Sequence, residues 1–545
     1  KSLIVINDRR KTQSFQVSWQ ASRDGKVFAS DSATLGIPPA ETSHLQIRFA
    51  APTVTARSVI SITAKVLAGD DDVPVKPMTL QVYPPAARAA QRNLAQWAIF
   101  DPTGKSTAAF APLGYVLPAI NDVAALPASA RVLVVGYGAL DDAQTADAAL
   151  AGLAERVRKG LQVLVLEQTA ETMNARFGLR AFTPGVRQVW VRQDNHPFLR
   201  DISNDDLADW RGQTTLGPLD GPPKSLTDDQ RPKRTWRCSQ FGVVASTIVE
   251  MPHVVGFSPI VDTGFDLRYS ALWENHEGMG RMVFCLLDVS DRAGKDPIVD
   301  TLLHNIVGDL DQPTRAFTAA TTQLVAPCAD APLSALSVNS AAPALADAGP
   351  GHVLVIPRGA AAWLEQHGKT LADYLTRGGR VLAVGLTLAE GQALSAAVGN
   401  TFNVSRETHW LNPLHSATPT AFHGVSPAAI RWRLKLECTV VNTVPTTGWR
   451  NDSGVLASIP VGKGHIVWLA ATPADFDAEQ RPDLVFSRVK TERLITTILG
   501  NLDVQCGRSW ADALEKSANA DSRRETDCYS DTRRLRDDPY ATMRW

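Results

Sequence analysis

The chain has 545 residues, 44% of them hydrophobic, with 55 lysines and arginines against 56 aspartates and glutamates. This length exceeds what one hydrophobic core organises and indicates about three or four domains of ordinary size. The formal net charge of −1 gives no electrostatic basis for binding nucleic acid or an anionic membrane. No apolar run reaches the about 18 residues that a membrane-spanning helix needs.

The first residues, KSLIVINDRR, begin directly in a strand-like pattern, without an initiator methionine or a leader. We therefore expect residue 1 to be an internal point of a longer protein. This chain would then be a processed piece, or the C-terminal part, of that protein.

Residues 1–85 predict a small all-β domain. Phe15, Val17 and Trp19 alternate with polar residues, which is the period of a strand that buries one face. About seven short runs of this kind, separated by turn signals such as Asp24-Gly25, predict an immunoglobulin-like β-sandwich.

Residues 86–312 and 313–505 repeat one α/β pattern. In the first copy the apolar run RVLVVG (131–136) is followed by a helical segment and a second apolar run, and HVLVI (352–356) begins the same series in the second copy. Later, GMGRMVFCLLDV (278–289) is echoed by GKGHIVWLAA (462–471), and an amphipathic helix follows each. Strand, helix and strand in succession predict a doubly wound, mostly parallel sheet in each copy.

The remaining segments have a polar composition. The stretch 201–236 is rich in proline and is expected to be a surface loop that makes the first copy longer. Residues 506–545 form a polar C-terminal tail, which is either disordered or laid across another surface.

The N-terminal region resembles the immunoglobulin-like domain that follows the catalytic barrel in β-galactosidase-type glycoside hydrolases of family two. The residues that carry this resemblance are Asn7, Phe15, Trp19, Asp24 and Gly25. The two later units resemble the class I glutamine-amidotransferase-like, flavodoxin-type domains appended to several β-galactosidase families. That likeness rests on residues 206–212 (DLADWRG) and on the two hairpins of GKG type, and residues 537–545 resemble the end of such an enzyme.

The resemblance implies a fold class and a role. The fold would be an N-terminal immunoglobulin-like sandwich followed by two tandem flavodoxin-like α/β domains. The catalytic carboxylates of such an enzyme lie on a barrel of about 250 residues, for which this chain has no room. The resemblance therefore implies a non-catalytic accessory region whose partner is a catalytic barrel domain or chain, in a periplasmic or extracellular protein. It also allows a homo-oligomer.

An active amidotransferase-type unit needs a cysteine on a tight strand-to-helix elbow, with a histidine as base. In the first copy this position reads Glu167-Gln168-Thr169, and in the second it reads Gly385-Leu386-Thr387. Because neither copy offers a cysteine or serine there, we expect no such chemistry.

Two alternatives remain open from the residues. Glu274 and Glu277 flank His276 near a hairpin turn and could serve as the carboxylate pair of a self-contained carbohydrate hydrolase, although a solvated turn is the favoured explanation, because the second copy lacks these charges. A glycan-binding module is the other alternative, because aromatic side chains stack on sugars and anchor interfaces. The candidate contact residues for a glycan or partner are Trp210, Arg211, Trp236, Trp410 and Trp545.

No cofactor or metal is predicted. Gly104-Lys105-Ser106 ends like a phosphate-binding loop but lacks its first glycine, and Gly136-Tyr137-Gly138 is not repeated in the second copy. The spacing of His409, His415 and His423 fits no zinc pattern. We expect Cys285, Trp190 and Trp468 to lie in the core.

Overall fold

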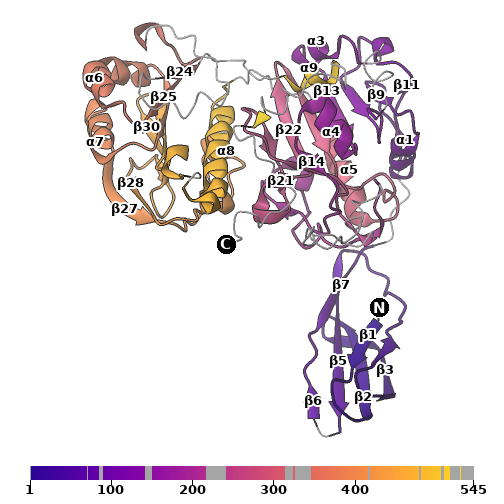
Figure 1. The fold of residues 1–545 in the computed structure, drawn as a ribbon. Coiled ribbons are helices and arrows are strands. Elements are labelled where there is room, and N and C mark those ends of the chain that lie inside the picture. Colours follow the sequence, from indigo (N-terminus) through magenta and orange to yellow (C-terminus); the bar gives the residue numbers. More distant parts are fainter. Residues whose placement is uncertain are drawn as a thin grey trace, which may run out of the picture. The chain divides into compact units, whose positions relative to one another are not determined.

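The computed structural model of the chain describes residues 2–69, 71–84, 90–141, 150–216, 241–312, 323–325, 345–414, 418–477, 480–504, 509–515 and 528–529 (Figure 1). The chain divides into two compact units, Lys1–Arg88 and Ala89–Trp545. The finer boundaries after residues 85, 312 and 505 stay predictions. The protein is a mixed α/β multidomain chain with antiparallel sheets first and mostly parallel sheets later.

Antiparallel strands make up the first unit. One sheet pairs β1 (Ser2–Ile6) with β4 (Thr42–Gln46), and the other has the order β3-β2-β5-β6, with β7 also paired to β5. The strands of this second sheet are β2 (Gln13–Arg23), β3 (Lys26–Ile37), β5 (Ser58–Ala68), β6 (Asp71–Val73) and β7 (Met78–Val82). The strands predicted for residues 1–85 are therefore present.

Both sheets of the first unit contribute to its core. Val5 of β1 packs with Phe15 and Val17 of β2. Trp19 belongs to a neighbouring cluster, and the centre of its ring lies 6.0 Å from that of Phe49. Phe15, Val17 and Trp19 are all buried, which confirms the period of two predicted for this strand.

A seven-stranded sheet forms the centre of the first α/β repeat, with the order β11-β9-β12-β13-β23-β22-β19. The strands from β11 to β23 run parallel, β22 runs antiparallel to β23, and β19 runs antiparallel to β22. Their bounds are β9 (Trp97–Phe100), β11 (Ala119–Ile120), β12 (Val132–Val135), β13 (Gln162–Leu166), β19 (Ser258–Pro259), β22 (Leu272–Glu277) and β23 (Gly280–Cys285). The predicted parallel strands and hairpin are therefore present.

Helices and smaller sheets complete this repeat. The helices are α1 (Lys105–Phe110), α3 (Leu153–Arg158), α4 (Ala170–Phe177) and α5 (Pro297–Leu310). The smaller pairings are β8 (Arg92–Asn93) with β10 (Tyr115–Val116), β15 (Trp190–Val191) with β20 (Val261–Asp262), β16 (Trp210–Gln213) with β17 (Phe241–Gly242), and β14 (Ala181–Phe182) with β18 (Ile248–Glu250) and β21 (Tyr269–Ser270).

The second α/β repeat has a six-stranded sheet of order β24-β25-β26-β31-β30-β29. The strands are β24 (Gln323–Val325), β25 (Val353–Pro357), β26 (Arg380–Val384), β29 (Trp449–Arg450), β30 (Leu456–Val461) and β31 (Gly464–Leu469). A separate two-stranded antiparallel sheet pairs β27 (Asn403–His409) with β28 (Leu436–Thr443). Strand for strand, the order and direction match β9-β12-β13-β23-β22-β19. The repetition predicted from the sequence is therefore also a repetition of topology.

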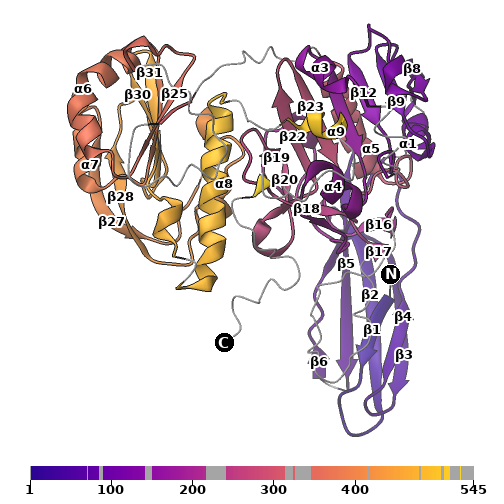
Figure 2. The same cartoon turned by 45° about the horizontal axis from the view of Figure 1, so that its top comes forward.

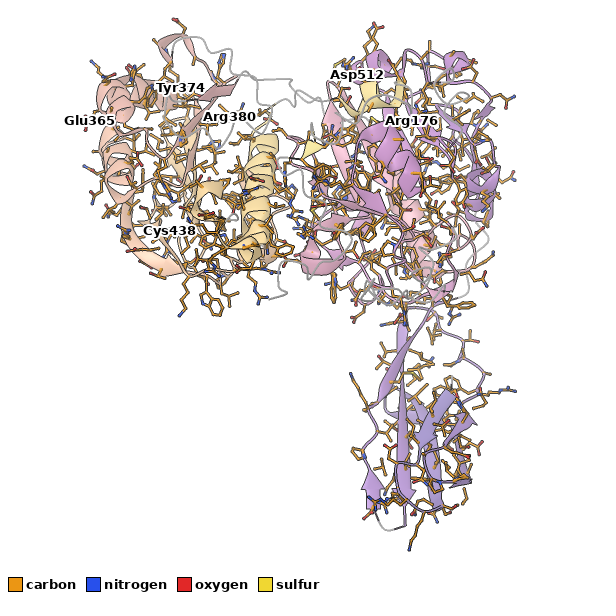
Figure 3. All side chains as sticks on the ribbon, viewed as in Figure 1. Arg176, Glu365, Tyr374, Arg380, Cys438 and Asp512 are labelled. Atoms are coloured by element: carbon orange, nitrogen blue, oxygen red, sulfur yellow. The ribbon has the colours of Figure 1, made fainter. Side chains whose placement is uncertain are left out.

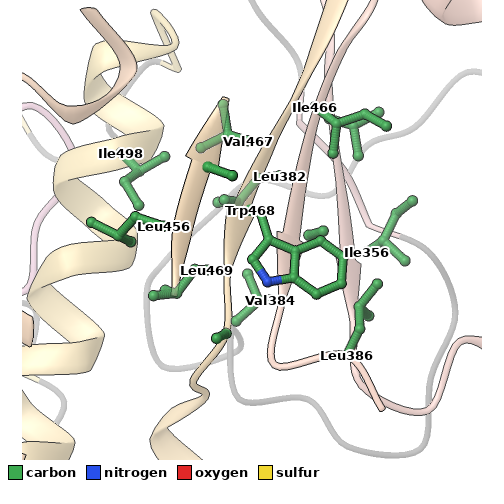
Figure 4. Packing of buried hydrophobic residues seen from close by; sticks show 14 of the residues in the cluster. Ile356, Leu382, Val384, Leu386, Leu456, Ile466, Val467, Trp468, Leu469 and Ile498 are labelled. Atoms are coloured by element: carbon green, nitrogen blue, oxygen red, sulfur yellow. The ribbon is translucent and has the colours of Figure 1, made fainter. Parts of the chain in front are cut away.

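Helices cover both faces of the second sheet. In Figures 1 and 2, α6 (Ala361–Thr376) and α7 (Leu388–Ala397) lie on one face and α8 (Val485–Asn501) on the other. Figure 4 shows the consequence for the core: Trp468 of β31 points to one side of the sheet, and Ile498 of α8 approaches from the opposite side. Trp468 is fully buried, as predicted.

The two α/β repeats contact each other through α8. Gly500 of this helix passes close to Gly256, since a Cβ atom on Gly500 would lie 3.1 Å from the backbone nitrogen of Gly256. Val255, also from the first repeat, belongs to the hydrophobic cluster of the second.

The described part of the tail returns to the first repeat. Helix α9 (Trp510–Glu515) lies beside α3 and α4, as Figure 2 shows. Asp512, labelled in Figure 3, pairs with Arg158 at 2.7 Å, and Arg176 of α4, also labelled, donates to the carbonyl oxygen of Leu514 at 2.7 Å. Of the two outcomes predicted for the tail, this segment follows the second, because it is laid across another surface.

The prediction for Trp190 is wrong, since 42% of this side chain is exposed. It lies on β15, a two-residue strand that pairs with β20 outside the central seven-stranded sheet. Among the helices of the described residues, none is long and apolar enough to cross a membrane.

Candidate functional site

The carboxyl ends of the parallel strands in the first repeat meet at one edge of the sheet, where α/β proteins commonly bind ligands. Glu167 follows β13 at this edge and is completely buried. It accepts hydrogen bonds from the backbone nitrogen of Ser290 at 2.8 Å and from its hydroxyl at 2.6 Å. Burial outweighs these bonds and raises the pKa of Glu167 to about 7.

Asp288 is a second buried carboxylate at this edge. It accepts from the backbone nitrogen and hydroxyl of Ser246 at 2.6 and 2.7 Å, and from the backbone nitrogen of Thr215 at 3.0 Å. Arg292 lies 3.4 Å away, but burial still raises the pKa of Asp288. Both carboxylates are therefore held by internal donors.

The two glycine-containing loops, residues 104–106 and 136–138, also make internal contacts at this edge. The ammonium group of Lys105 lies 4.0 Å from the centre of the Tyr137 ring, and Ser106 Oγ accepts from the backbone nitrogen of Tyr137 at 2.7 Å. A Cβ atom on Gly136 would lie 2.7 Å from a carboxylate oxygen of Asp101. Gly136 thus serves close packing between the ends of β9 and β12.

The same edge of the second repeat carries different residues. Arg358, after β25, forms a bidentate pair with Asp475 at 2.6 and 3.1 Å and donates to the carbonyl oxygen of Gly385 at 2.6 Å. Glu390 accepts from the backbone nitrogens of Gly359 and Thr387, and with Thr387 forms a capping box at the start of α7.

The expected nucleophile position can be compared between the repeats, because in each it follows the corresponding parallel strand, β13 or β26, and precedes a threonine N-cap, Thr169 or Thr387. In the first repeat Gln168 donates to the carbonyl oxygens of Gly136 and Leu166. In the second, Leu386 is buried in the core. Neither position presents a nucleophilic atom.

Glu274 is buried and held by three basic side chains. Its carboxylate lies 3.2 Å from Arg281, 3.5 Å from His196 and 3.6 Å from His276. Burial acts to raise its pKa, but the interactions with His196 and His276 outweigh burial and hold the pKa of Glu274 well below its usual range.

Glu277 instead accepts hydrogen bonds from the N-terminal end of helix α9. It accepts from the hydroxyl of Ser509 at 2.7 Å and from the backbone nitrogens of Trp510 and Ala511. Burial nevertheless raises its pKa. Residues three apart in a strand point to opposite faces, so Glu274 and Glu277 leave β22 on opposite sides. Two carboxylates that act on one glycosidic bond must instead face each other across a cleft.

The candidate contact residues have different environments. Trp210 is 3% exposed and donates its indole N–H to the carbonyl oxygen of Asp206 at 2.8 Å, whereas the neighbouring Arg211 is exposed. Trp410 is 54% exposed and stands next to Leu411, which is also exposed. Trp410 therefore offers a ring that a sugar or partner can reach. Trp236 and Trp545 lie outside the described residues.

Among the described residues, no group of three or more His, Cys, Asp or Glu side chains could hold a metal ion. His409 lies 3.1 Å from Glu407, and His415 falls outside the described residues. Cys285 is a buried free thiol, as predicted, and burial raises its pKa.

Sequence reasoning missed a mostly buried ionic cluster where α8 meets the first repeat. Lys490 lies 3.2 Å from Asp266, His253 lies 3.6 Å from Glu492, and Arg493 donates to the carbonyl oxygen of Arg268 at 3.0 Å. The charged residues on α8 interrupt its apolar pattern, and this interruption was the available signal. Their partners are more than two hundred residues away, which no local pattern reveals.

No protein-family model matches the sequence. No curated protein matches it either. Among solved structures, the chain is weakly similar to a Paenibacillus sp. cycloisomaltooligosaccharide glucanotransferase complexed with cycloisomaltoheptaose, a carbohydrate-active enzyme, with 9% sequence identity and a TM-score of 0.14. The match covers 84% of this chain and 57% of that one, so this chain spans little more than half of its length. A likeness at this TM-score carries no argument about function.

Proposed function

We propose that this chain is the non-catalytic accessory region of a large β-galactosidase-like glycoside hydrolase. Its first unit would be the immunoglobulin-like sandwich of such an enzyme, and its two α/β repeats would be flavodoxin-like, amidotransferase-like domains. The catalytic carboxylates would lie on a barrel outside this chain, in a periplasmic or extracellular protein. The accessory region would shape the substrate cleft or a quaternary interface.

The observation that supports the proposal most directly is the chemistry of the two strand-to-helix junctions. Both junctions keep the threonine cap and the helix, but Gln168 is engaged with backbone carbonyls and Leu386 is packed in the core. The absence of a nucleophile from both junctions is compatible with a scaffold and incompatible with amidotransferase chemistry at these positions.

The alternative of a self-contained hydrolase has less support. Glu274 and Glu277 point to opposite faces of β22, and both are occupied by structural donors. A glycan-binding role keeps one specific observation in its favour, the exposed ring of Trp410 beside Leu411.

The test is an assay of the purified chain with aryl β-galactosides and other aryl glycosides, combined with native mass measurement of the material from its source. We expect no turnover, and a native mass that includes a barrel-sized partner or a longer precursor. Turnover that Glu274→Gln abolishes would overturn the proposal and favour the hydrolase. Saccharide binding without turnover that is lost in Trp410→Ala, but retained in Trp190→Ala as a matched exposed-tryptophan control, would favour the glycan-binding module.

A further inference from the structure

A small cavity lies between α8 and the first α/β repeat, both within the compact unit Ala89–Trp545. Its volume is about 30 Å³, enough for about one or two water-sized particles. Three cationic side chains, Arg192, Lys490 and Arg493, contribute to its lining, and apolar residues such as Phe257 and Leu494 form much of the rest. Among the described residues that line it, none carries a carboxylate.

The three cations differ in their counter-charges. Arg192 pairs with Asp262 at 2.9 Å, and Lys490 pairs with Asp266 at 3.2 Å. Arg493 forms no ion pair within the described part of the chain. Its guanidinium donates only to backbone carbonyl oxygens, those of Val489 and Arg268, and its Nη2 has no hydrogen-bond partner among the same residues.

Neighbouring carboxylates are already shared. Glu250 lies within 3.8 Å of Arg180 and 3.5 Å of Arg268, so one carboxylate serves two buried arginines. Asp266 likewise serves Lys490 and Arg433. His253 lies in the same region, but a histidine side chain is neutral or positively charged and cannot balance these cations. The region therefore holds more positive than negative charge, and Arg493 carries the part of the excess that is both buried and unpaired.

A buried guanidinium without a close ion pair is costly, because the more distant carboxylates of Glu250 and Asp266 offset only part of its desolvation. Burial lowers the pKa of Arg493 to about 10, which still leaves the side chain charged at neutral pH. Bound water would satisfy the free N–H groups, but it would not balance the charge. A small anion would do both.

We propose that this cavity binds a small monovalent inorganic anion, of the size of chloride or bromide, as the counter-ion of Arg493. The anion accepts hydrogen bonds from Nη2 of Arg493 and lies in the field of Arg192 and Lys490. It thereby joins α8 of the second repeat to the first repeat. The volume excludes anions as large as gluconate.

The experiment compares thermal unfolding of the whole chain in sodium chloride or bromide with that in sodium gluconate at constant ionic strength. We expect a saturable rise of a few degrees in Tm with either halide, since a ligand bound only by the folded state stabilises it. Arg493→Met should remove this halide dependence. Arg488→Met, which removes an arginine on the same helix that does not line the cavity, should retain it. An equal halide response in Arg493→Met, or no halide response in the wild-type chain, would overturn the proposal.

A second measurement avoids the need for a folded variant. Crystals of the wild-type chain soaked in bromide should show an anomalous peak in the cavity beside Arg493. A cavity that contains only water under these conditions would contradict the proposal, whatever the variants do.

Discussion

Gly280 of β23 and Gly464 of β31 occupy the same place in the two α/β repeats, one residue after the turn of the final hairpin. A Cβ atom on Gly280 would overlap the carbonyl oxygens of Val157 and Leu161, and one on Gly464 would overlap those of Leu375 and Gly379. In each repeat the hairpin thus packs directly against the backbone at the C-terminal end of a crossover helix, α3 or α6, and just beyond it. The glycines repeat because this packing repeats.

Replacing either glycine with alanine should therefore destabilise its repeat. We expect Gly280→Ala and Gly464→Ala each to lower the free energy of unfolding by about 2 kcal/mol or more, because backbone carbonyls cannot move aside as side chains do. Gly308→Ala is the matched control, since Gly308 lies within helix α5 with open space around its Cβ position. That variant should be neutral, or more stable by up to about 1 kcal/mol. Denaturant titration measures all three.

Glu167 should make the stability of the first repeat depend on pH. Its pKa is about 7 in the folded chain against 4.5 ordinarily, so the unfolded state loses its proton first as pH rises. Stability from this group is therefore present at low pH, falls between about pH 4.5 and 7, and stays lost above that range. Glu167→Gln imitates the protonated form and should be more stable than wild type by about 3 kcal/mol at pH 8.

The same comparison at pH 5 provides the control for Glu167→Gln. The advantage of the variant should shrink to a small fraction of its value at pH 8. An advantage independent of pH would mean that the substitution improves packing, and that the carboxyl group does not titrate in this range.

Trp510 of α9 should be a major contributor to the first repeat. It is fully buried, with its ring centre 6.2 Å from that of Phe177 and 6.1 Å from that of Phe284. We expect Trp510→Ala to lower the free energy of unfolding by about 3–5 kcal/mol. Trp410→Ala removes an equally large but exposed ring and should change it by less than about 0.5 kcal/mol. Equal effects would show that α9 does not pack as described.

Tyr529 provides a second contact from the tail. Its hydroxyl donates to the carbonyl oxygen of Glu250 at 2.6 Å and accepts from the backbone nitrogen of Arg180 at 2.9 Å. Tyr529→Phe leaves both backbone groups without this partner and should cost about 1–3 kcal/mol. Tyr115→Phe removes a hydroxyl that meets His304 at the surface and should cost distinctly less. Thermal or denaturant unfolding distinguishes the two variants.

Local patterns predicted most of the framework. The buried strand β12 is a continuous apolar run, and β13 is one after its first residue, Gln162. Strand β2 shows a clean alternation, so neighbouring residues predict both burial patterns. The topological repeat followed from the likeness of the two hairpins. Trp190 was misjudged, because a strand of two residues carries too little pattern to reveal whether a second layer covers it.

The interactions of the candidate site were less predictable. Glu277 reads as a polar residue near a turn, but it caps a helix that begins more than two hundred residues later. The pairing of Lys490 with Asp266 likewise depends on how α8 meets the first repeat. Such pairs form only when separate elements pack together, so no spacing of residues in the sequence predicts them.

Because α9 and Tyr529 pack on the first repeat, that repeat is completed only after the second repeat has been synthesised. Residues 90–312 emerge first, yet the indole that fills their core and the donors that satisfy Glu277 come from residues 509–515. Until those residues leave the exit tunnel, the nascent first repeat lacks the buried indole ring of Trp510 and the donors to Glu277. A segment made after both repeats therefore completes the first of them, and the second repeat must fold without obstructing that closure.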